Sequence, residues 1–324
     1  MNIMLHDPVL INDWHAVAEV KDLEGQNPLS ARLLGEDIVI WQVDGQVFAW
    51  QDLCIHRGAK LSLGKVADGC LVCPYHGWTY GADGRCVRIP AHPDQTPPAK
   101  AQVKTYRAQM KYGLIWVTLG EPTHDIPTFP EWEDDSYRNL PAGPYYFQAA
   151  APRVIENFLD VAHFPFVHAG SLGDPRYPEI SDYEAQITDE GIVSENIRVW
   201  QPNPDGTGVG GEVAYTYRVF RPLVAYFVKI KGPSFAAMYP VCPIDELQSK
   251  GWVLMSMNYG FDQSAESIIA FQDVVTGEDI PIVESQRPEK LPLDLQAELH
   301  LRSDRTAIAY RKWLRQLGLT FGTA

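Results

Sequence analysis

The residues best suited to metal chemistry lie in one stretch, from Arg153 to His168. It contains Asn157, Asp160 and His163 as well as His168 itself. Residues three apart share one face of a helix, so Asp160 is expected to face both Asn157 and His163. Two imidazoles and one carboxylate on one side of an iron would leave its other positions open, as dioxygen chemistry requires. Taken alone, the spacing is equally compatible with a helix that carries two surface histidines.

Pro165 lies between the two histidines of this stretch. His163 and His168 are five residues apart, so on a regular helix their side chains would point about 140° away from each other. Because proline cannot donate its backbone hydrogen bond, we expect the helix to kink or widen at Pro165. That distortion would turn His168 towards His163.

A second group of candidate ligands, Cys54-x-His56 and Cys73-x-x-His76, lies earlier in the chain, with sixteen residues between the two pairs. Two cysteines and two histidines on paired loops are the ligand set of a Rieske [2Fe–2S] centre, in which one iron takes the thiolates and the other takes the imidazoles. The same four residue types also suit tetrahedral zinc, but zinc fingers open on a Cys-x2–4-Cys pair. The Cys-x-His pair therefore favours the cluster over zinc.

The elements that must position these residues fall into two domains. Short segments rich in β-branched and aromatic residues predict an all-β first domain, residues 1–122. The stretch from Glu121 to Pro144 is rich in proline and acidic residues and is predicted to be the domain linker.

The remainder, residues 123–324, is predicted to be an α+β catalytic domain of helix-grip-like form. About six segments of alternating polarity between Tyr183 and Tyr259 predict one antiparallel sheet. Flanking helices are expected from Ser264 towards Gln286 and from Asp304 to Leu317.

Charge and composition narrow the possible partners and location. A net charge of −14 argues against nucleic acid as the main partner. Residues 57–111 nevertheless carry nine Lys/Arg against three Asp/Glu, which predicts a docking face for an acidic protein; an accidental solvated patch is the alternative. No apolar run is long enough to span a bilayer, and no secretory signal is seen. Together with five cysteines, an odd number, this favours a reducing, cytoplasmic location.

With these residues in place, the sequence resembles the Rieske non-heme iron oxygenases, of the phthalate-oxygenase and O-demethylase type with only an α subunit. The motifs that carry this resemblance are Cys54/His56/Cys73/His76, Asn157-x-x-Asp160-x-x-His163-x4-His168 and the late stretch from Glu278 to Pro288. Within the family the chain looks most like the oxygenases that tailor saxitoxin, through residues 89–93, 163–168 and 303–318.

The resemblance implies specific roles for the residues of the catalytic domain. His163 and His168 would hold a mononuclear Fe(II), and Asp279 would supply the third ligand. The nearby acids Asp273 and Glu278 would then be exposed helix charges.

The resemblance also implies that the catalytic residue Asp160 links His163 to His76 of a neighbouring subunit, which requires a head-to-tail homotrimer. Asn157 resembles the family's iron-proximal Asn, a weak or indirect partner of the metal.

A substrate pocket is expected beside the third ligand. Gln272 and Thr276 lie seven and three residues before Asp279, so they share its helix face and should look into the pocket. Met255, on the predicted sheet, is expected to line the same pocket. A core or surface role for these residues is the alternative.

The function implied is that of the terminal component of an oxygenase system. It would use O2 to hydroxylate a C–H bond of a small molecule, or to remove an O- or N-methyl group oxidatively. Electrons would come from NAD(P)H through a separate ferredoxin or flavin reductase, because the chain has no flavin or dinucleotide fingerprint.

Three alternatives remain open from the sequence. The acidic body and the subgroup resemblance favour a saxitoxin-like guanidinium alkaloid as the substrate, whereas an aromatic acid or methyl ether would need an Arg or Lys in the pocket. A Rieske protein that only transfers electrons is the alternative of another class. Such carriers staple their cluster loops with two further cysteines, and those places hold Ala59 and Tyr75 here.

The cluster prediction can be tested on the purified protein. We expect a red-brown protein whose electron paramagnetic resonance spectrum after reduction is of the Rieske type. A colourless protein that holds stoichiometric zinc would show that the Cys/His set is a zinc site.

Overall fold

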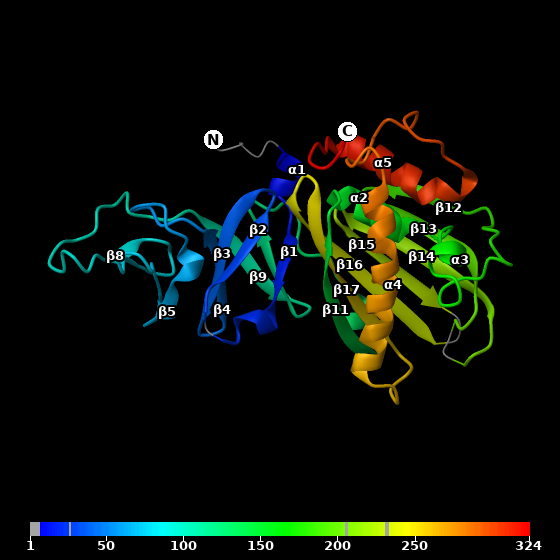
Figure 1. The fold of residues 1–324 in the computed structure, drawn as a ribbon, viewed down its shortest axis with the longest axis horizontal. Helices are drawn as coiled ribbons and strands as arrows, with labels where there is room; N and C mark the ends of the chain where they lie inside the picture. Colours follow the sequence, from blue (N-terminus) through cyan, green and yellow to red (C-terminus); the bar gives the residue numbers. More distant parts are fainter. Residues whose placement is uncertain (1–6, 26, 205–206, 231–232) are drawn as a thin grey trace. The chain divides into compact units, whose positions relative to one another are not determined.

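The computed structural model describes residues 7–25, 27–204, 207–230 and 233–324. The chain divides into two compact units, and the division falls between Ile126 and Pro127, shortly after the residue-122 boundary that the sequence predicts. Each unit has its own β-structure, as Figure 1 shows. The α+β class is confirmed, with an all-β unit first and a unit with one large antiparallel sheet second.

The first unit is built on two antiparallel sheets. The larger sheet has six strands in the order β1-β10-β9-β4-β3-β2, and the smaller has four in the order β5-β6-β7-β8. The larger sheet contains β1 (His15–Glu19), β2 (Leu29–Leu33), β3 (Glu36–Val43), β4 (Gln46–Gln51), β9 (Thr105–Lys111) and β10 (Leu114–Thr118). The smaller sheet contains β5 (Lys65–Ala67), β6 (Cys70–Val72), β7 (Thr79–Tyr80) and β8 (Cys86–Arg88). A one-turn helix, α1 (Pro8–Ile11), and the 3-10 helices η1 (Val20–Leu23) and η2 (Leu61–Leu63) complete the unit.

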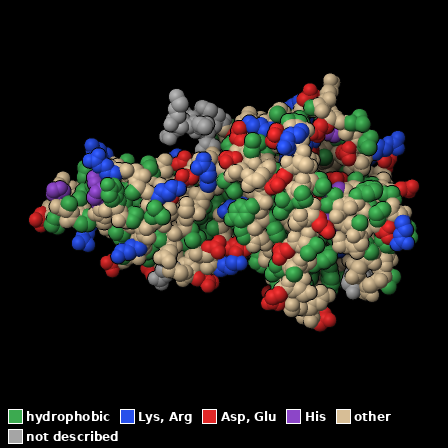
Figure 2. Space-filling view, in the orientation of Figure 1, with side chains coloured by type: hydrophobic (Ala, Val, Ile, Leu, Met, Phe, Trp, Pro, Cys, Tyr) green, Lys and Arg blue, Asp and Glu red, His purple; other side chains and the backbone are tan. Residues whose placement is uncertain are grey.

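The core of this unit joins the large sheet to the region of the small one. Trp41 and Trp50 are fully buried, and they belong to the same hydrophobic cluster as Cys54 and Cys73. Two of the four candidate cluster ligands, Cys54 and Cys73, are therefore anchored in the hydrophobic core of this unit. Figure 2 shows histidine side chains at the surface of the end of this unit where β5 and β8 lie in Figure 1.

The second unit contains a seven-stranded antiparallel sheet in the order β11-β17-β16-β15-β14-β13-β12. Its strands are β11 (Arg138–Phe147), β12 (Glu184–Thr188), β13 (Gly191–Gln201), β14 (Gly211–Arg221), β15 (Val224–Ile230), β16 (Ser234–Asp245) and β17 (Gln248–Met257). The helices are α2 (Ala151–Leu159), α3 (Phe164–Val167), α4 (Ala265–Ser285) and α5 (Arg305–Leu317), with the 3-10 helices η3 (Pro130–Trp132) and η4 (Arg302–Asp304).

The helices lie against the sheet at separate places (Figure 1). α2 packs against β15, β16 and β17, α4 packs against β11 and α2, and α5 packs against β12 and β13. No helix among the described residues is both long and apolar enough to cross a membrane.

The seventh strand corrects the prediction of a linker up to Pro144. Residues from Arg138 onwards form β11, which pairs with β17 at the edge of the sheet. Prolines are tolerated there because an edge strand has unpaired backbone groups on one side, and because the pairing shifts register between Ala142 and Tyr145. Proline content alone could not separate an edge strand from a linker.

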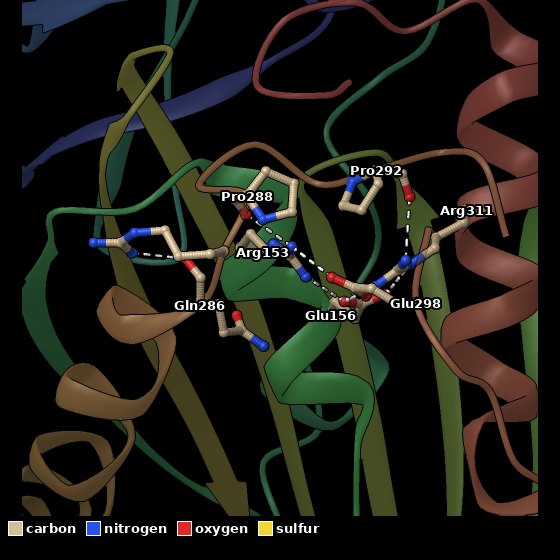
Figure 3. Close-up of polar contacts among 8 residues, drawn as sticks. Arg153, Glu156, Gln286, Pro288, Pro292, Glu298 and Arg311 are labelled. Atoms are coloured by element: carbon tan, nitrogen blue, oxygen red, sulfur yellow. Dashed lines mark hydrogen bonds and ion pairs between the residues drawn. The ribbon is translucent and has the colours of Figure 1, made fainter. Parts of the chain in front are cut away.

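A buried network of charges fixes α2 to the C-terminal part of the unit (Figure 3). Arg311 of α5 forms a two-pronged pair with Glu156 of α2, and its Nη2 also contacts Glu298. Arg153 of α2 contacts the other oxygen of Glu298 at 2.8 Å and donates to the Pro288 carbonyl at 2.8 Å. Both arginine side chains are only 2% exposed, so these charges depend on one another.

Removal of one member of the network should destabilise the second unit. We expect Arg311→Met to lower the free energy of unfolding by about 3–5 kcal/mol, because Glu156 and Glu298 would keep their charges without a full partner. Arg302→Met is a matched control, because Arg302 is 83% exposed and should contribute less than about 1 kcal/mol. Urea unfolding followed by tryptophan fluorescence measures both, and equal midpoints would contradict the assigned role.

Candidate active site

The two cysteine loops of the first unit share one backbone plan. In each loop the cysteine N–H donates to the carbonyl five residues later, from Cys54 to Ala59 at 2.8 Å and from Cys73 to Trp78 at 2.9 Å. The two loops thus match in backbone hydrogen bonding, and such a pair of loops can hold a two-iron cluster from both sides.

A glycine four residues after each cysteine closes the loop. Gly58 and Gly77 donate to the carbonyls of Cys54 and Cys73, and their φ angles are 71° and 69°. That left-handed conformation favours glycine. A Cβ on Gly77 would also lie 3.1 Å from Pro90 Cγ, so both conformation and space restrict this position.

The four candidate cluster ligands lie together at the ends of these loops. Cys54 and Cys73 are each 2% exposed, and the rings of His56 and His76 lie 4.6 Å apart. His56 Nδ1 is buried, and no hydrogen-bond partner is found for it among the described residues. Burial raises the pKa of the Cys73 thiol, so a buried thiolate here needs a positive partner. Two thiols and an unpartnered imidazole nitrogen fit an iron–sulfur cluster.

Tyr80 and Trp78 surround this site. The Tyr80 hydroxyl lies 3.1 Å from Cys54 Sγ, and burial raises the pKa of the phenol, so the hydroxyl keeps its proton. Towards a metal-bound thiolate the phenol can only donate. The Trp78 ring stacks on His56 with a centroid distance of 4.5 Å and shields one face of that imidazole.

In the second unit, the stretch that carries the histidines is not one helix. α2 ends at Leu159, Asp160 has extended backbone with φ −86° and ψ 132°, and α3 begins only at Phe164. The predicted distortion at Pro165 is therefore wrong in its position. Pro165 occupies the first turn of α3, where a missing N–H costs no hydrogen bond.

The break at Asp160 is made by its own side chain. Oδ1 accepts the N–H of Ala162 at 2.8 Å, and Oδ2 lies 3.0 Å from His163 Nδ1. The predicted contact between Asp160 and His163 exists, but a turn and not a helix face creates it.

His163, His168 and Asp279 form the compact group of potential metal ligands. Asp279 Oδ1 lies 3.4 Å from His163 Nε2 and 3.1 Å from His168 Nε2. Asn157 Nδ2 of α2 is 3.4 Å from the same oxygen. One carboxylate from α4 thus meets two imidazoles from the α2–α3 segment, a set that suits Fe(II) with further positions open.

Each imidazole is held from behind by a second carboxylate. Asp160 contacts Nδ1 of His163, and Glu278 lies 2.7 Å from Nδ1 of His168. A proton on each Nδ1 leaves each Nε2 as the ligand atom. The prediction that Glu278 is merely an exposed helix charge is wrong, and Asp273, although exposed, accepts a hydrogen bond from Tyr145 at 2.7 Å.

The electrostatics of this group favour a bound cation. Burial opposes a charged imidazole, but hydrogen bonds to Asp160 and Asp279 outweigh it and raise the pKa of His163 to about 9. Burial likewise opposes a charged Asp279, but hydrogen bonds to His163 and His168 lower its pKa to about 2. The same surplus of negative charge that keeps a proton on His163 would attract a divalent metal.

A cavity of about 390 Å³ lies beside these residues. Aromatic side chains of the sheet and of α2 line it, and the Phe158 ring lies 5.4 Å from Phe227 and 5.0 Å from Tyr239. Such a volume suits a small molecule, and flat rings on its wall suit a flat one.

The three pocket residues named from the sequence all line this cavity, namely Met255, Gln272 and Thr276. Gln272 Nε2 donates to Thr276 Oγ1 at 3.0 Å, so the two side chains form one polar edge on α4. Their shared helix face explains their positions.

Other cavity residues could not be identified from the sequence. Gln201, Tyr215 and Lys229 line the cavity from three neighbouring strands. Alternation along each strand predicts which residues share a face, but only strand order and register bring the three together.

Two family models match this chain, one within each compact unit. The family model described as Rieske [2Fe-2S] domain matches residues 13–107. The model described as Vanillate O-demethylase oxygenase C-terminal domain matches residues 147–320.

Individual relatives match almost the whole chain. Methylxanthine N1-demethylase NdmA of Pseudomonas putida is 35% identical over 317 residues, which cover 94% of this chain and 88% of the relative. Methylxanthine N3-demethylase NdmB of the same species is 30% identical, with 95% and 89% covered. The solved structure of Pseudomonas putida CBB5 NdmA with caffeine has a TM-score of 0.84 at 33% identity and covers 95% of this chain and 90% of that one.

The Tyr80 contact predicts a change in reduction potential. Reduction adds negative charge to the cluster, and a donor to a cluster thiolate stabilises that charge. We expect Tyr80→Phe to lower the midpoint potential by about 40 mV, which corresponds to about 1 kcal/mol for a one-electron couple. Tyr106→Phe is the matched control, because that phenol bonds Glu36 and no cysteine. Identical potentials in both variants would remove the tuning role.

Asp160 and His163 should fail in different ways when changed. Asp160→Asn keeps the volume of the side chain, while His168 and Asp279 remain as ligands, so mononuclear iron should stay bound. Cluster reduction should also stay normal, whereas product per single turnover should fall by a factor on the order of 100 or more. His163→Ala should lose the mononuclear iron itself. Iron analysis, rapid-mixing reduction and single-turnover assays compare the two, and loss of iron from Asp160→Asn would show that its role is structural.

Proposed function

Because the chain belongs to the Rieske non-heme iron oxygenases, with a catalytic domain of the vanillate O-demethylase type, we propose that it oxidatively removes a methyl group from a nitrogen of a flat heterocycle of the methylxanthine class. The enzyme is an oxidoreductase, the terminal component of its oxygenase system, with a Rieske [2Fe–2S] cluster, mononuclear iron and O2 as co-substrate.

The observation that carries this proposal is the character of the cavity beside His163, His168 and Asp279. Its walls combine aromatic rings with amide and hydroxyl groups, which together bind a flat ring that bears oxygen and nitrogen atoms. The two relatives named above, which each match at least 94% of this chain, are N-demethylases of methylxanthines, and this supports the same substrate class.

We assign the site residues as follows. Cys54, His56, Cys73 and His76 hold the cluster, and His163, His168 and Asp279 hold the iron. When bound, these groups supply the electrons and the activated O2 for attack on a methyl C–H bond.

The remaining roles belong to side chains near the metal. Glu278 and Asp160 keep each imidazole in the tautomer that presents Nε2. Asn157 donates to Oδ1 of Asp279, the oxygen that faces both imidazoles, and so helps to orient that carboxylate. The aromatic wall excludes water and holds the ring so that one methyl group faces the metal.

The reaction balances with O2, two electrons and two protons. One oxygen atom enters the methyl C–H bond and the other leaves as water. The resulting N–CH2OH group breaks at its C–N bond, which yields formaldehyde and the N–H product. Loss of a methyl from oxygen would follow the same course.

The proposal includes partners that the family uses. Electrons come from NAD(P)H through a separate reductase with a ferredoxin or flavin centre. Asp160 links His163 to His76 of a neighbouring subunit, in a homotrimer. The side chain of Asp160 is 35% exposed and His76 is exposed, so both are accessible within their own units.

A second candidate is O-demethylation of an aromatic acid. It is favoured by Lys229, which lines the cavity and could pair with a carboxylate. A saxitoxin-like guanidinium compound has less support, because the only carboxylate among the described cavity-lining residues is Asp279, which is assigned to the metal.

The test is formaldehyde release by the purified enzyme, loaded with both iron centres and supplied with a reductase that accepts more than one oxygenase. We expect caffeine or a dimethylxanthine to give formaldehyde, with one O2 and one NADH consumed for each formaldehyde formed. Vanillate and a guanidinium alkaloid are tested in parallel to decide among the three classes.

His163→Ala is the matched control, because it should abolish formaldehyde while leaving cluster reduction intact. NADH consumption that gives hydrogen peroxide but no formaldehyde from any methylated substrate would contradict demethylation. A hydroxylated ring as the main product would replace demethylation by hydroxylation.

A further inference from the structure

Two tyrosine side chains in the cavity wall carry hydroxyl groups that the protein itself does not use. Tyr217 of β14 is 1% exposed and Tyr239 of β16 is 4% exposed, and both line the cavity. Among the described residues, no hydrogen-bond partner is found for either hydroxyl. By contrast, Gln272 of the same wall already donates to Thr276. Buried polar groups normally have a partner, so the two hydroxyls are expected to bond a ligand.

Each of the two hydroxyls opens to the cavity. In the part of the chain that the structure describes, some polar atoms are fully buried without a partner, such as Nε1 of Trp252, but neither phenol oxygen belongs to them. Both oxygens therefore keep accessible surface, although each side chain is almost entirely buried. The cavity is the space that Tyr217 and Tyr239 both line.

Both phenols lie towards the candidate metal ligands. Burial raises the pKa of Tyr217 and of Tyr239 well above the ordinary value for a phenol, and the negative charge of Asp279 adds to the rise in each case. Each hydroxyl therefore keeps its proton within electrostatic reach of that carboxylate. Both phenol rings also contact Phe158, which follows Asn157, and the Asn157 amide contacts Asp279.

The ring of Phe158 brings the two phenols to one ligand position. Its centroid lies 5.9 Å from that of Tyr217 and 5.0 Å from that of Tyr239. The phenols stand on the two strands that flank β15, and Phe227 of β15 lies 5.4 Å from Phe158. A flat ring that packs against Phe158 can therefore meet one hydroxyl on each side.

We propose that Tyr217 and Tyr239 donate hydrogen bonds to the two carbonyl oxygens that flank the reacting N-methyl group, so that the enzyme removes a methyl group from an imide nitrogen. This inference rests on the proposed function, because it narrows the substrate of the same cavity. In a methylxanthine, the imide nitrogen lies between two carbonyl carbons of the six-membered ring. Every other nitrogen that can carry a methyl group has at most one carbonyl next to it.

The physical reason is the cost of an unpaired donor. A ligand that fills the cavity displaces water from both hydroxyls, and a buried donor without an acceptor costs about 1–3 kcal/mol. A carbonyl oxygen on each side of the reacting methyl group removes that cost for both hydroxyls at once. A substrate placed with any other N-methyl group at the metal ligands leaves one hydroxyl unpaired, so the imide position is favoured.

Calorimetric titration of the holoenzyme with caffeine, in the absence of oxygen, tests the two contacts. Tyr217→Phe and Tyr239→Phe remove only the hydroxyl. Each change should weaken caffeine binding about fivefold, which corresponds to the loss of one hydrogen bond of about 1 kcal/mol. Tyr226→Phe is the matched control, because this β15 hydroxyl donates to Glu131 and the side chain does not line the cavity. The control should bind caffeine like wild type.

A second ligand, 6-thiocaffeine, tests the same contacts without relying on the variants. It keeps the shape of caffeine but has sulfur, a weaker acceptor, in place of one of the two carbonyl oxygens. Wild type should bind it about fivefold more weakly than caffeine. One of the two Phe variants should then lose less than twofold with this ligand, because the bond that its hydroxyl makes is already missing. That variant identifies which tyrosine faces the substituted oxygen.

The position of attack gives an independent measurement. Theophylline carries one methyl group on the imide nitrogen and one on a nitrogen with a single adjacent carbonyl. We expect 3-methylxanthine, the product of attack at the imide position, as the main product. The variant that combines Tyr217→Phe and Tyr239→Phe should lower the ratio of 3-methylxanthine to 1-methylxanthine at least fivefold.

The outcomes keep this inference separate from demethylation itself. Unchanged caffeine binding in either Phe variant, equal losses for caffeine and 6-thiocaffeine in both variants, or 1-methylxanthine as the main product would each overturn the inference. If formaldehyde is still released in those cases, demethylation stands. The expected pattern of affinities without formaldehyde rejects demethylation alone. Absence of caffeine binding to wild type rejects the substrate class and this inference with it.

Discussion

The structure depends on one geometric constraint, that two imidazole nitrogens must point at a single carboxylate oxygen from another helix. His163 and His168 can do so only if their rings are fixed in both tautomer and rotation. Asp160 and Glu278 supply that restraint from behind, at 3.0 and 2.7 Å. Asp160 is three residues before His163, and Glu278 is next to Asp279 in the sequence. A small shift of either backbone segment would therefore disturb the carboxylates and the imidazoles together.

The rest of the second unit holds in place α4 and the α2–α3 segment, which carry these residues. α2 is tied to α5 and to the segment before it through Arg153, Glu156 and Arg311, all nearly buried. α4 carries Asp279 and packs against both β11 and α2. The network is costly to bury, and it contributes mainly by permitting one arrangement of charges. In this way three potential metal ligands meet although the segments that carry them are far apart in the chain.

The sheet lines the cavity beside the candidate metal ligands with two kinds of side chain. Most are aromatic rings, and Gln201 and Lys229, which contact each other, are polar. In the first unit, two loops with the same backbone plan do a comparable task for the cluster with local hydrogen bonds alone. The two centres are therefore positioned by different means, one by short loops and the other by long-range packing.

The sequence by itself determined the features that depend on residues close together in the chain. The candidate cluster residues lie in loops closed within five residues, so their motif and spacing were enough to predict them. Asp279 was expected only from the family resemblance, and Gln272 and Thr276 then followed because they share its helix face. The all-β unit and the antiparallel sheet followed from alternation. Two predictions from local sequence were wrong. Pro165 was expected to distort a helix, but the helix has already ended before Asp160. The prolines between Arg138 and Pro144 were assigned to a linker, but they belong to the edge strand β11.

Only the tertiary structure decided which distant groups meet. Glu278 contacts a histidine 110 residues earlier, and Lys229 meets Gln201 across two strand pairings. Such contacts depend on strand order, register and helix packing, which no short window of sequence encodes. For that reason the sequence predicted the candidate metal ligands, whereas the carboxylates that hold their imidazoles from behind are seen only in the fold.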